Sequence, residues 1–263
     1  MATRADLTIA ALRSGHEALS ALVRDLTADD LTRPSGASQW QISQVLSHLG
    51  SGAEIGLAAL TASQTNAPAP DGDFNRTVWA RWNAMPPAEH ARGFLEANQL
   101  LVEAYESLDA TTRTQLQVDL GFLPQPVDVA TAARFRLNEF ALHRWDIEVG
   151  FTPDATVAPE AVELLLDHVK SMLGWISKPG ALAGRQATLV LRLWEPDRTY
   201  GLRLGNGVDL IDAPQHADGE LQAPAEAWLR LAVGRLGPRY TPQDLRLTGP
   251  LSLDDLRRIF PGY

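Results

Sequence analysis

Apolar residues recur at three- and four-residue intervals along the first part of the chain, and this spacing predicts amphipathic helices. The clearest stripe begins at Leu12 and continues through Leu19 and Leu26. Long helices are predicted over residues 5–26, 40–62, 87–108 and 127–149, with a shorter helical piece over 74–84. Gly150 follows the last of them and suits a helix C-terminus. Four long helices in succession predict an up-and-down four-helix bundle.

The pattern changes after Pro153, where shorter apolar runs follow one another between turn residues. Three strands, joined by tight turns and therefore antiparallel, are predicted over residues 187–194, 199–204 and 208–211. Helices are predicted over residues 159–177, 224–236 and 252–259, with Ser252 as the cap of the last. The predicted fold class is therefore two-domain α+β. The bundle occupies residues 1–152, and a small α+β domain with an antiparallel sheet occupies residues 158–263.

Composition narrows the possible partners. Of the 263 residues, 45% are hydrophobic and 21% are charged, as in an ordinary globular protein, and the net charge is −9. An acidic chain without clustered Lys and Arg is not expected to bind nucleic acid or an anionic membrane surface, so a small molecule is the expected partner. No run approaches ~18 apolar residues and the start carries no signal-peptide pattern, so a cytoplasmic location is predicted. The chain has no cysteine, so a thiol used in its chemistry must come from another molecule.

The candidate chemistry lies on two of the predicted helices. Glu139 and His143 are four residues apart and share one helical face, where they can bind one ion while a third ligand comes from a neighbouring helix. His48, on the inward side of the second helix, is that third candidate. Three protein ligands leave coordination positions open, as in catalytic metal sites. The alternative is a polar network without metal, in which Glu139 pairs with Arg136 or with His143.

Four stretches of the chain resemble segments of a known family. The run Trp-Gln-Ile-Ser-Gln-Val-Leu-Ser-His-Leu, from Trp40 to Leu49, resembles the second-helix signature of the mycothiol-dependent maleylpyruvate isomerase family, one of the DinB-like metal-binding bundles. The run from Glu139 to Asp146 resembles its fourth-helix motif. Phe74-Asn75 resembles its short asparagine-bearing segment, and residues 223–235 resemble a helix of its C-terminal domain.

The resemblance implies a divalent ion, with zinc expected, held by His48, Glu139 and His143. Mycothiol or another low-molecular-weight thiol is the implied co-substrate. The resemblance also implies catalytic roles for Arg235, which can hold a carboxylate through two parallel hydrogen bonds, and for Asn75. The alternatives are structural roles: Arg235 bonds the last carbonyls of its helix, and Asn75 caps a short helix.

We expect Asp146 to bond backbone near its helix end, with orientation of a metal ligand as the alternative. His16 lies on an apolar stripe and is expected to be a packed residue rather than part of the site. We expect the substrate pocket where the two domains meet, and a monomer or homodimer. The predicted function is a metal-dependent thiol transferase or isomerase. A hydrolase or amidase that activates water with the same ligands, and a non-catalytic small-molecule binding or resistance protein, are the alternatives.

Overall fold

A computed structural model describes residues 2–262, and the chain divides into two compact units between Ala155 and Thr156. This division lies inside the segment where the sequence pattern changes. Within the described residues, no helix is long and apolar enough to cross a membrane.

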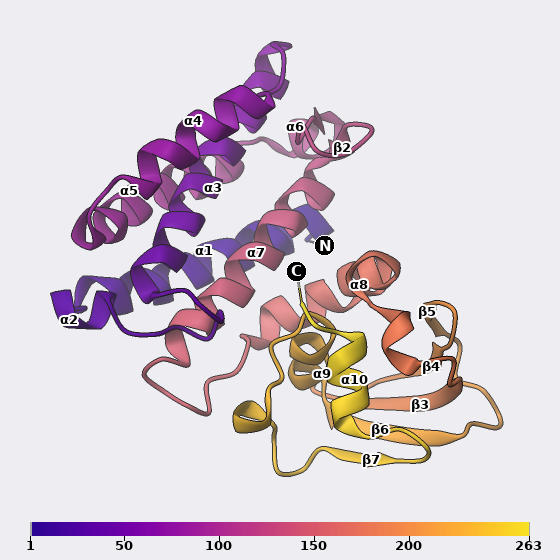
Figure 1. Cartoon of the computed structure of the whole chain (residues 1–263). Coiled ribbons are helices and arrows are strands. Elements are labelled where there is room, and N and C mark those ends of the chain that lie inside the picture. Colours follow the sequence, from indigo (N-terminus) through magenta and orange to yellow (C-terminus); the bar gives the residue numbers. More distant parts are fainter. Residues whose placement is uncertain (1, 263) are drawn as a thin grey trace. The chain divides into compact units, whose positions relative to one another are not determined.

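The N-terminal unit is helical (Figure 1). Its elements are α1 (Arg4–Arg24), α2 (Ala28–Leu31), α3 (Ile42–Thr65), α4 (Gly72–Asn83), α5 (Pro87–Glu106), α6 (Ala110–Gln115), β1 (Gln117–Val118), β2 (Val127–Asp128) and α7 (Val129–Glu148). Two of the long helices, α1 and α7, begin where short polar side chains accept the first free backbone N–H groups. Thr3 caps α1 through a reciprocal pair of bonds with Asp6, and Asp128 caps α7 through the backbone N–H of Thr131. The four predicted long helices are confirmed, each within a few residues of its predicted ends.

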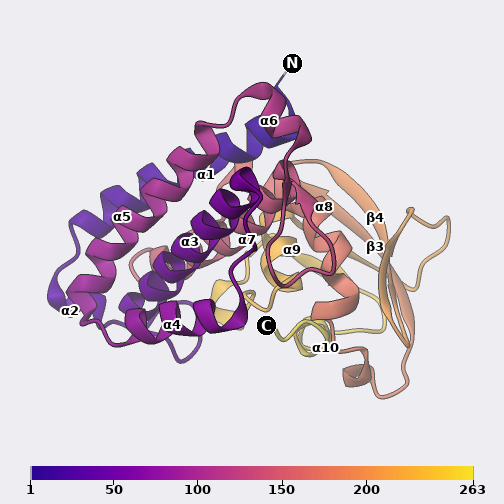
Figure 2. The ribbon, with the colours of Figure 1, turned by 90° about the horizontal axis from the view of Figure 1, so that it is seen from above.

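These four helices, α1, α3, α5 and α7, form the bundle, but they do not alternate in direction. On α1 and α5, Arg13 bonds Glu106 whereas His16 bonds Asn98, so these two helices are antiparallel. The helices α3 and α5 run in the same direction, and α7 runs against α3 (Figures 1 and 2). The order of directions is therefore up, down, down, up, and the expected simple alternation is wrong. The reason is α4, which carries the chain back along the bundle before α5 begins.

Trp82 of α4 packs where α3 and α5 approach each other. Its indole is only 2% exposed and donates a hydrogen bond from Nε1 to Glu54 at 2.9 Å. A Cβ placed on Gly50 would lie 2.1 Å from the ring, and one on Gly93 would lie 2.9 Å from it. Both glycines are therefore needed for the ring to fit between the two helices.

The C-terminal unit is an α+β domain, as predicted. Its elements are α8 (Pro159–Ile176), η1 (Pro179–Leu182), β3 (Ala187–Trp194), β4 (Arg198–Leu204), β5 (Val208–Ile211), β6 (Gly219–Pro224), α9 (Ala225–Ala232), η2 (Pro238–Tyr240), β7 (Arg246–Thr248) and α10 (Leu253–Ile259). The three predicted strands form an antiparallel β3–β4–β5 meander. Ser252 caps α10 as predicted, accepting from the N–H of Asp255.

The sheet has five strands in the order β5-β4-β3-β6-β7, and it is mixed rather than antiparallel. The chain crosses from β5 to the other side of β3, so that β6 pairs with β3 in parallel. The prediction missed this pairing because β6 is short and leads directly into α9, and β7 has only three residues. Alternate residues of β3 are buried, and α9 packs on β3 and β6.

Candidate metal centre

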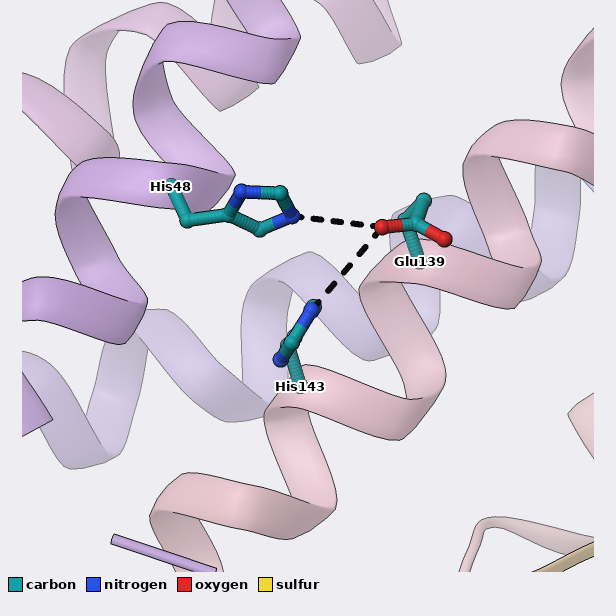
Figure 3. A group of neighbouring side chains, drawn as sticks. All are labelled: His48, Glu139 and His143. Carbon is teal, nitrogen blue, oxygen red and sulfur yellow. Dashed lines mark hydrogen bonds and ion pairs between the residues drawn. The ribbon is translucent and has the colours of Figure 1, made fainter. Parts of the chain in front are cut away.

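Three side chains from two helices of the bundle meet at one point (Figure 3). His48 lies on α3, and Glu139 and His143 lie one turn apart on α7. The Nε2 atom of His48 is 3.2 Å from Oε2 of Glu139, and the Nε2 atom of His143 is 3.8 Å from the same oxygen. One ligand atom from each residue lies within 4.8 Å of the others. The predicted convergence of these side chains is confirmed.

The spacing of the three ligand atoms suits a small divalent cation. Ligands bonded to zinc at about 2.0–2.1 Å in a tetrahedral arrangement lie about 3.4 Å apart. The 3.2 and 3.8 Å separations lie on either side of this value. Two imidazole nitrogens and one carboxylate oxygen also form a donor set that zinc accepts. The residues therefore fit the ion, and the three ligands leave a further position for water or substrate.

The site is more open than the sequence pattern suggested. The side chains of His48 and Glu139 are each 37% exposed, whereas the side chain of His143 is 11% exposed. Neither Glu139 nor His48 is enclosed in an apolar interior. The cost of burying unpaired polar groups is therefore not the reason that these two side chains lie together. The exposed side of the site is accessible to a small molecule.

Asp146 lies directly behind His143. Its carboxylate is fully buried, and Oδ2 is 2.8 Å from Nδ1 of His143. When Nδ1 carries the proton and donates to this carboxylate, Nε2 keeps its lone pair free to face Glu139 and His48. This contact supports the alternative expectation, that Asp146 orients a metal ligand, because the side chain turns back by one helical turn to reach the imidazole.

A second polar group lies deeper in the bundle and involves all four helices. Nη2 of Arg136 donates to the carbonyl of Leu49 at 2.9 Å and to Oδ1 of Asn98 at 2.6 Å. The amide nitrogen of Asn98 lies 2.8 Å from Nδ1 of His16. Burial lowers the pKa of Arg136 to about 10, while the charge of Glu139 acts in the opposite direction. Burial also lowers the pKa of His16, which is a packed core residue as expected.

Residues 12–148, just over half of the chain, match the family description "Mycothiol maleylpyruvate isomerase N-terminal domain". The chain belongs to the mycothiol maleylpyruvate isomerase family. The matched segment contains all three residues of the candidate metal centre. No match was found among curated proteins.

The fold of the whole chain resembles that of a solved family member. A crystal structure of the mycothiol-dependent maleylpyruvate isomerase superimposes with a TM-score of 0.65 at 14% identity, covering 96% of this chain and 98% of that one. A structure of a histidine-to-alanine mutant of that isomerase gives a TM-score of 0.66 at the same identity and coverage. At this identity the likeness establishes the two-domain fold of the family.

The remaining predicted site residues lie outside the His48, Glu139 and His143 cluster. Asn75 is within α4, which Asp71 caps, so Asn75 is not a cap. Its Oδ1 atom is buried and has no hydrogen-bond partner among the described residues. Arg235 follows the C-terminal end of α9 and donates from Nη1 to the carbonyl of Val233 at 3.4 Å. This contact agrees with the alternative that Arg235 bonds the last carbonyls of its helix. The catalytic roles of Asn75 and Arg235 stay predictions.

Trp40 lies beside the candidate metal centre, although no role was predicted for it from the sequence. Its indole lies 5.3 Å from the ring of His48 and 5.9 Å from that of His143, measured between centroids. The signal was present, because Trp40 belongs to the same motif as His48 in the family resemblance.

Proposed function

We propose that this protein is a metal-dependent enzyme that uses mycothiol, or a similar low-molecular-weight thiol, to isomerise or conjugate a small electrophilic metabolite. The observation that carries the proposal is the convergence of His48, Glu139 and His143 in a chain of this family. Zinc is the proposed ion, because the donor set and the spacing suit it.

Bound zinc would lower the pKa of a thiol at its open position, so that the nucleophilic thiolate is present at neutral pH. The sulfur must come from a co-substrate because the chain has no cysteine. Asp146 keeps Nε2 of His143 directed at the site, and the exposed sides of His48 and Glu139 leave room for the co-substrate.

The two proposed reactions share their first step. The thiolate adds to a conjugated double bond, forming a carbon–sulfur bond and leaving a single bond that can rotate. In the isomerase, the carbon–sulfur bond then breaks and the thiol is recovered unchanged. In the transferase, the carbon–sulfur bond is kept and a proton completes the adduct. We propose that Asn75 accepts a hydrogen bond from a ligand and that Arg235 binds a substrate carboxylate.

The test is turnover of maleylpyruvate by protein that has been stripped of metal and reloaded with zinc. We expect conversion only when zinc and mycothiol are both present, and none with His143→Ala, because the remaining two protein ligands do not replace the lost imidazole. Formation of a stable thiol adduct would select the transferase.

Three results would contradict the proposal. Turnover without metal would remove the ion from the mechanism. Hydrolysis of an ester or amide without thiol would support the hydrolase alternative, and stoichiometric ligand binding without any turnover would support the binding protein. An Arg235→Lys variant with an unchanged KM and kcat would remove Arg235 from the substrate site, since Lys cannot reproduce the bidentate contact.

A further inference from the structure

A short loop before α3, residues 33–41, carries Trp40 and closes on itself. Pro34 and Gln41 form an isolated antiparallel bridge. The N–H of Ser35 donates to the carbonyl of Trp40 at 3.0 Å, and the N–H of Ile42 donates to the carbonyl of Arg33 at 3.0 Å. These bonds fix the backbone of Trp40 directly beside the N-terminus of α3, two turns before His48. We call residues 33–41 the Trp40 loop.

The Trp40 loop is also attached to α7, the other helix that carries site residues. The N–H of Gly36 donates to the carbonyl of Asp146 at 2.7 Å. A Cβ on Gly36 would lie 2.7 Å from the side chain of Val149 and 3.0 Å from Cα of Asp146, so only glycine allows this approach. The guanidinium of Arg33 donates to the carbonyl of Gly150 at 3.0 Å. The loop therefore spans the ends of α3 and α7 and fixes Trp40 relative to both.

The backbone before Trp40 has an unusual conformation. Gln39 has a φ of 75°, in the left-handed region that non-glycine residues seldom adopt. Such a conformation costs of the order of 1–3 kcal/mol and persists only where the surrounding contacts hold it. Here the conformation is held by the hydrogen bonds of the Trp40 loop, which also place the indole next to the two imidazoles.

The indole of Trp40 packs against the candidate metal ligands. Its ring plane is inclined by 18° to that of His143 and by 52° to that of His48. The two imidazoles lie 4.6 Å apart and edge to face. The three rings therefore form one cluster, in which Trp40 is 37% exposed.

The two imidazoles differ in how the protein holds them. His143 is held through Nδ1 by the buried carboxylate of Asp146. For His48, the hydrogen bond between Nε2 and Glu139 is on the metal side, and among residues 2–262 its Nδ1 has no partner. Metal-bound histidines usually have their second nitrogen held by a carboxylate, a carbonyl or water. Ring contacts with Trp40, at 5.3 Å, and with His143, at 4.6 Å, are thus the support that the described residues provide for the second side of His48.

We propose that Trp40 is a positioning residue that keeps the imidazole of His48 turned toward Glu139. The proposal rests on the proposed metal site for its purpose, but ring position can be measured without any metal.

Metal-free protein labelled with nitrogen-15 reports the imidazole signals of His48. In Trp40→Ala we expect these signals to broaden and shift as the ring samples other rotamers. In Trp40→Phe they should stay close to those of the wild type, because a ring still packs there. His16, hydrogen-bonded to Asn98 in the core, is the internal control and should not change in either variant.

Zinc affinity provides the second readout. Loss of a group that orients a metal ligand weakens binding by about 10–100-fold, and we expect about 10-fold in Trp40→Ala, with recovery in Trp40→Phe. A Trp40→Leu variant keeps an apolar side chain without a ring, and if Trp40→Ala fails to fold it takes the place of that variant in both measurements.

The positioning role is overturned if the signals of His48 are unchanged without the aromatic ring, or if Trp40→Phe loses as much zinc affinity as Trp40→Ala. A wild-type protein that binds no zinc would contradict the proposed function, while the signals of His48 would still decide whether Trp40 positions the ring.

Discussion

Replacement of Gly50 by alanine tests the packing that holds α3 against its neighbours. The new Cβ would lie 2.1 Å from Cη2 and 2.3 Å from Cζ3 of Trp82, whereas ordinary contacts begin near 3.4 Å. The ring would have to move by more than 1 Å, and at 2% exposure it has no free space to enter. Overpacking of this kind costs about 1–3 kcal/mol, against a gain of about 0.5–1 kcal/mol from replacing a helical glycine. We therefore expect Gly50→Ala to lower the free energy of unfolding by about 1–2 kcal/mol.

Gly56 on the same helix is the matched control. Its Cβ would meet only Leu101, at 3.4 and 3.8 Å, so Gly56→Ala should raise the free energy of unfolding by about 0.5–1 kcal/mol. Urea unfolding of the full chain, followed by circular dichroism, measures both variants. Trp82→Leu should reduce the cost of Gly50→Ala, because the clashing ring is gone. Equal effects of the two alanine substitutions would refute this account of the packing.

Two further predictions concern buried or bonded carboxylates. Asp146→Asn should weaken zinc binding by about 10–100-fold in a chelator competition assay, because an amide does not stabilise the required protonation of His143; an unchanged dissociation constant would contradict the role given to Asp146. Bonds from Arg185 and Ser252 hold the pKa of Asp255 well below its ordinary 3.8. A depressed folded-state pKa stabilises the protein above the unfolded-state value and this stabilisation is lost as pH falls, so wild-type urea midpoints should decline between pH 5 and 2 more steeply than those of Asp255→Asn. Parallel curves for the two proteins would show that Asp255 contributes nothing to the acid sensitivity.

The long helices were accessible from the sequence because their signal is local. The stripe through Leu12 and Leu19, and the cap signal at Ser252, depend only on neighbouring residues. Helix direction and strand pairing depend on contacts between distant segments. Nothing in the pattern over 74–84 indicates that α4 returns the chain along the bundle. The parallel pairing of β3 with β6 likewise depends on a crossover that periodicity does not encode.

Some residues of the candidate site were likewise accessible from the sequence, whereas the roles of others depend on three-dimensional contacts. His48, Glu139 and His143 could be found because the pair on α7 has the spacing of one helical turn and because the family motif supplies the third residue. The role of Asp146 depends on its side-chain rotamer, and the role of Trp40 depends on a loop held by Gly36 and by the left-handed backbone of Gln39. Both were present in the sequence motifs, but only the three-dimensional contacts distinguish support of a ligand from ordinary packing.

The central claim is that His48, Glu139 and His143 together bind one metal ion. The number of zinc ions bound per chain tests this claim. Protein stripped with a chelator, reloaded with zinc and freed of unbound ion should contain one equivalent per chain. His143→Ala should contain much less while its circular dichroism stays close to that of the wild type, because the bundle is held mainly by its apolar core. His216→Ala, in an exposed loop of the C-terminal unit, is the control and should bind as the wild type does. Zinc retained in full by His143→Ala, or absent from the wild type, would contradict the central claim.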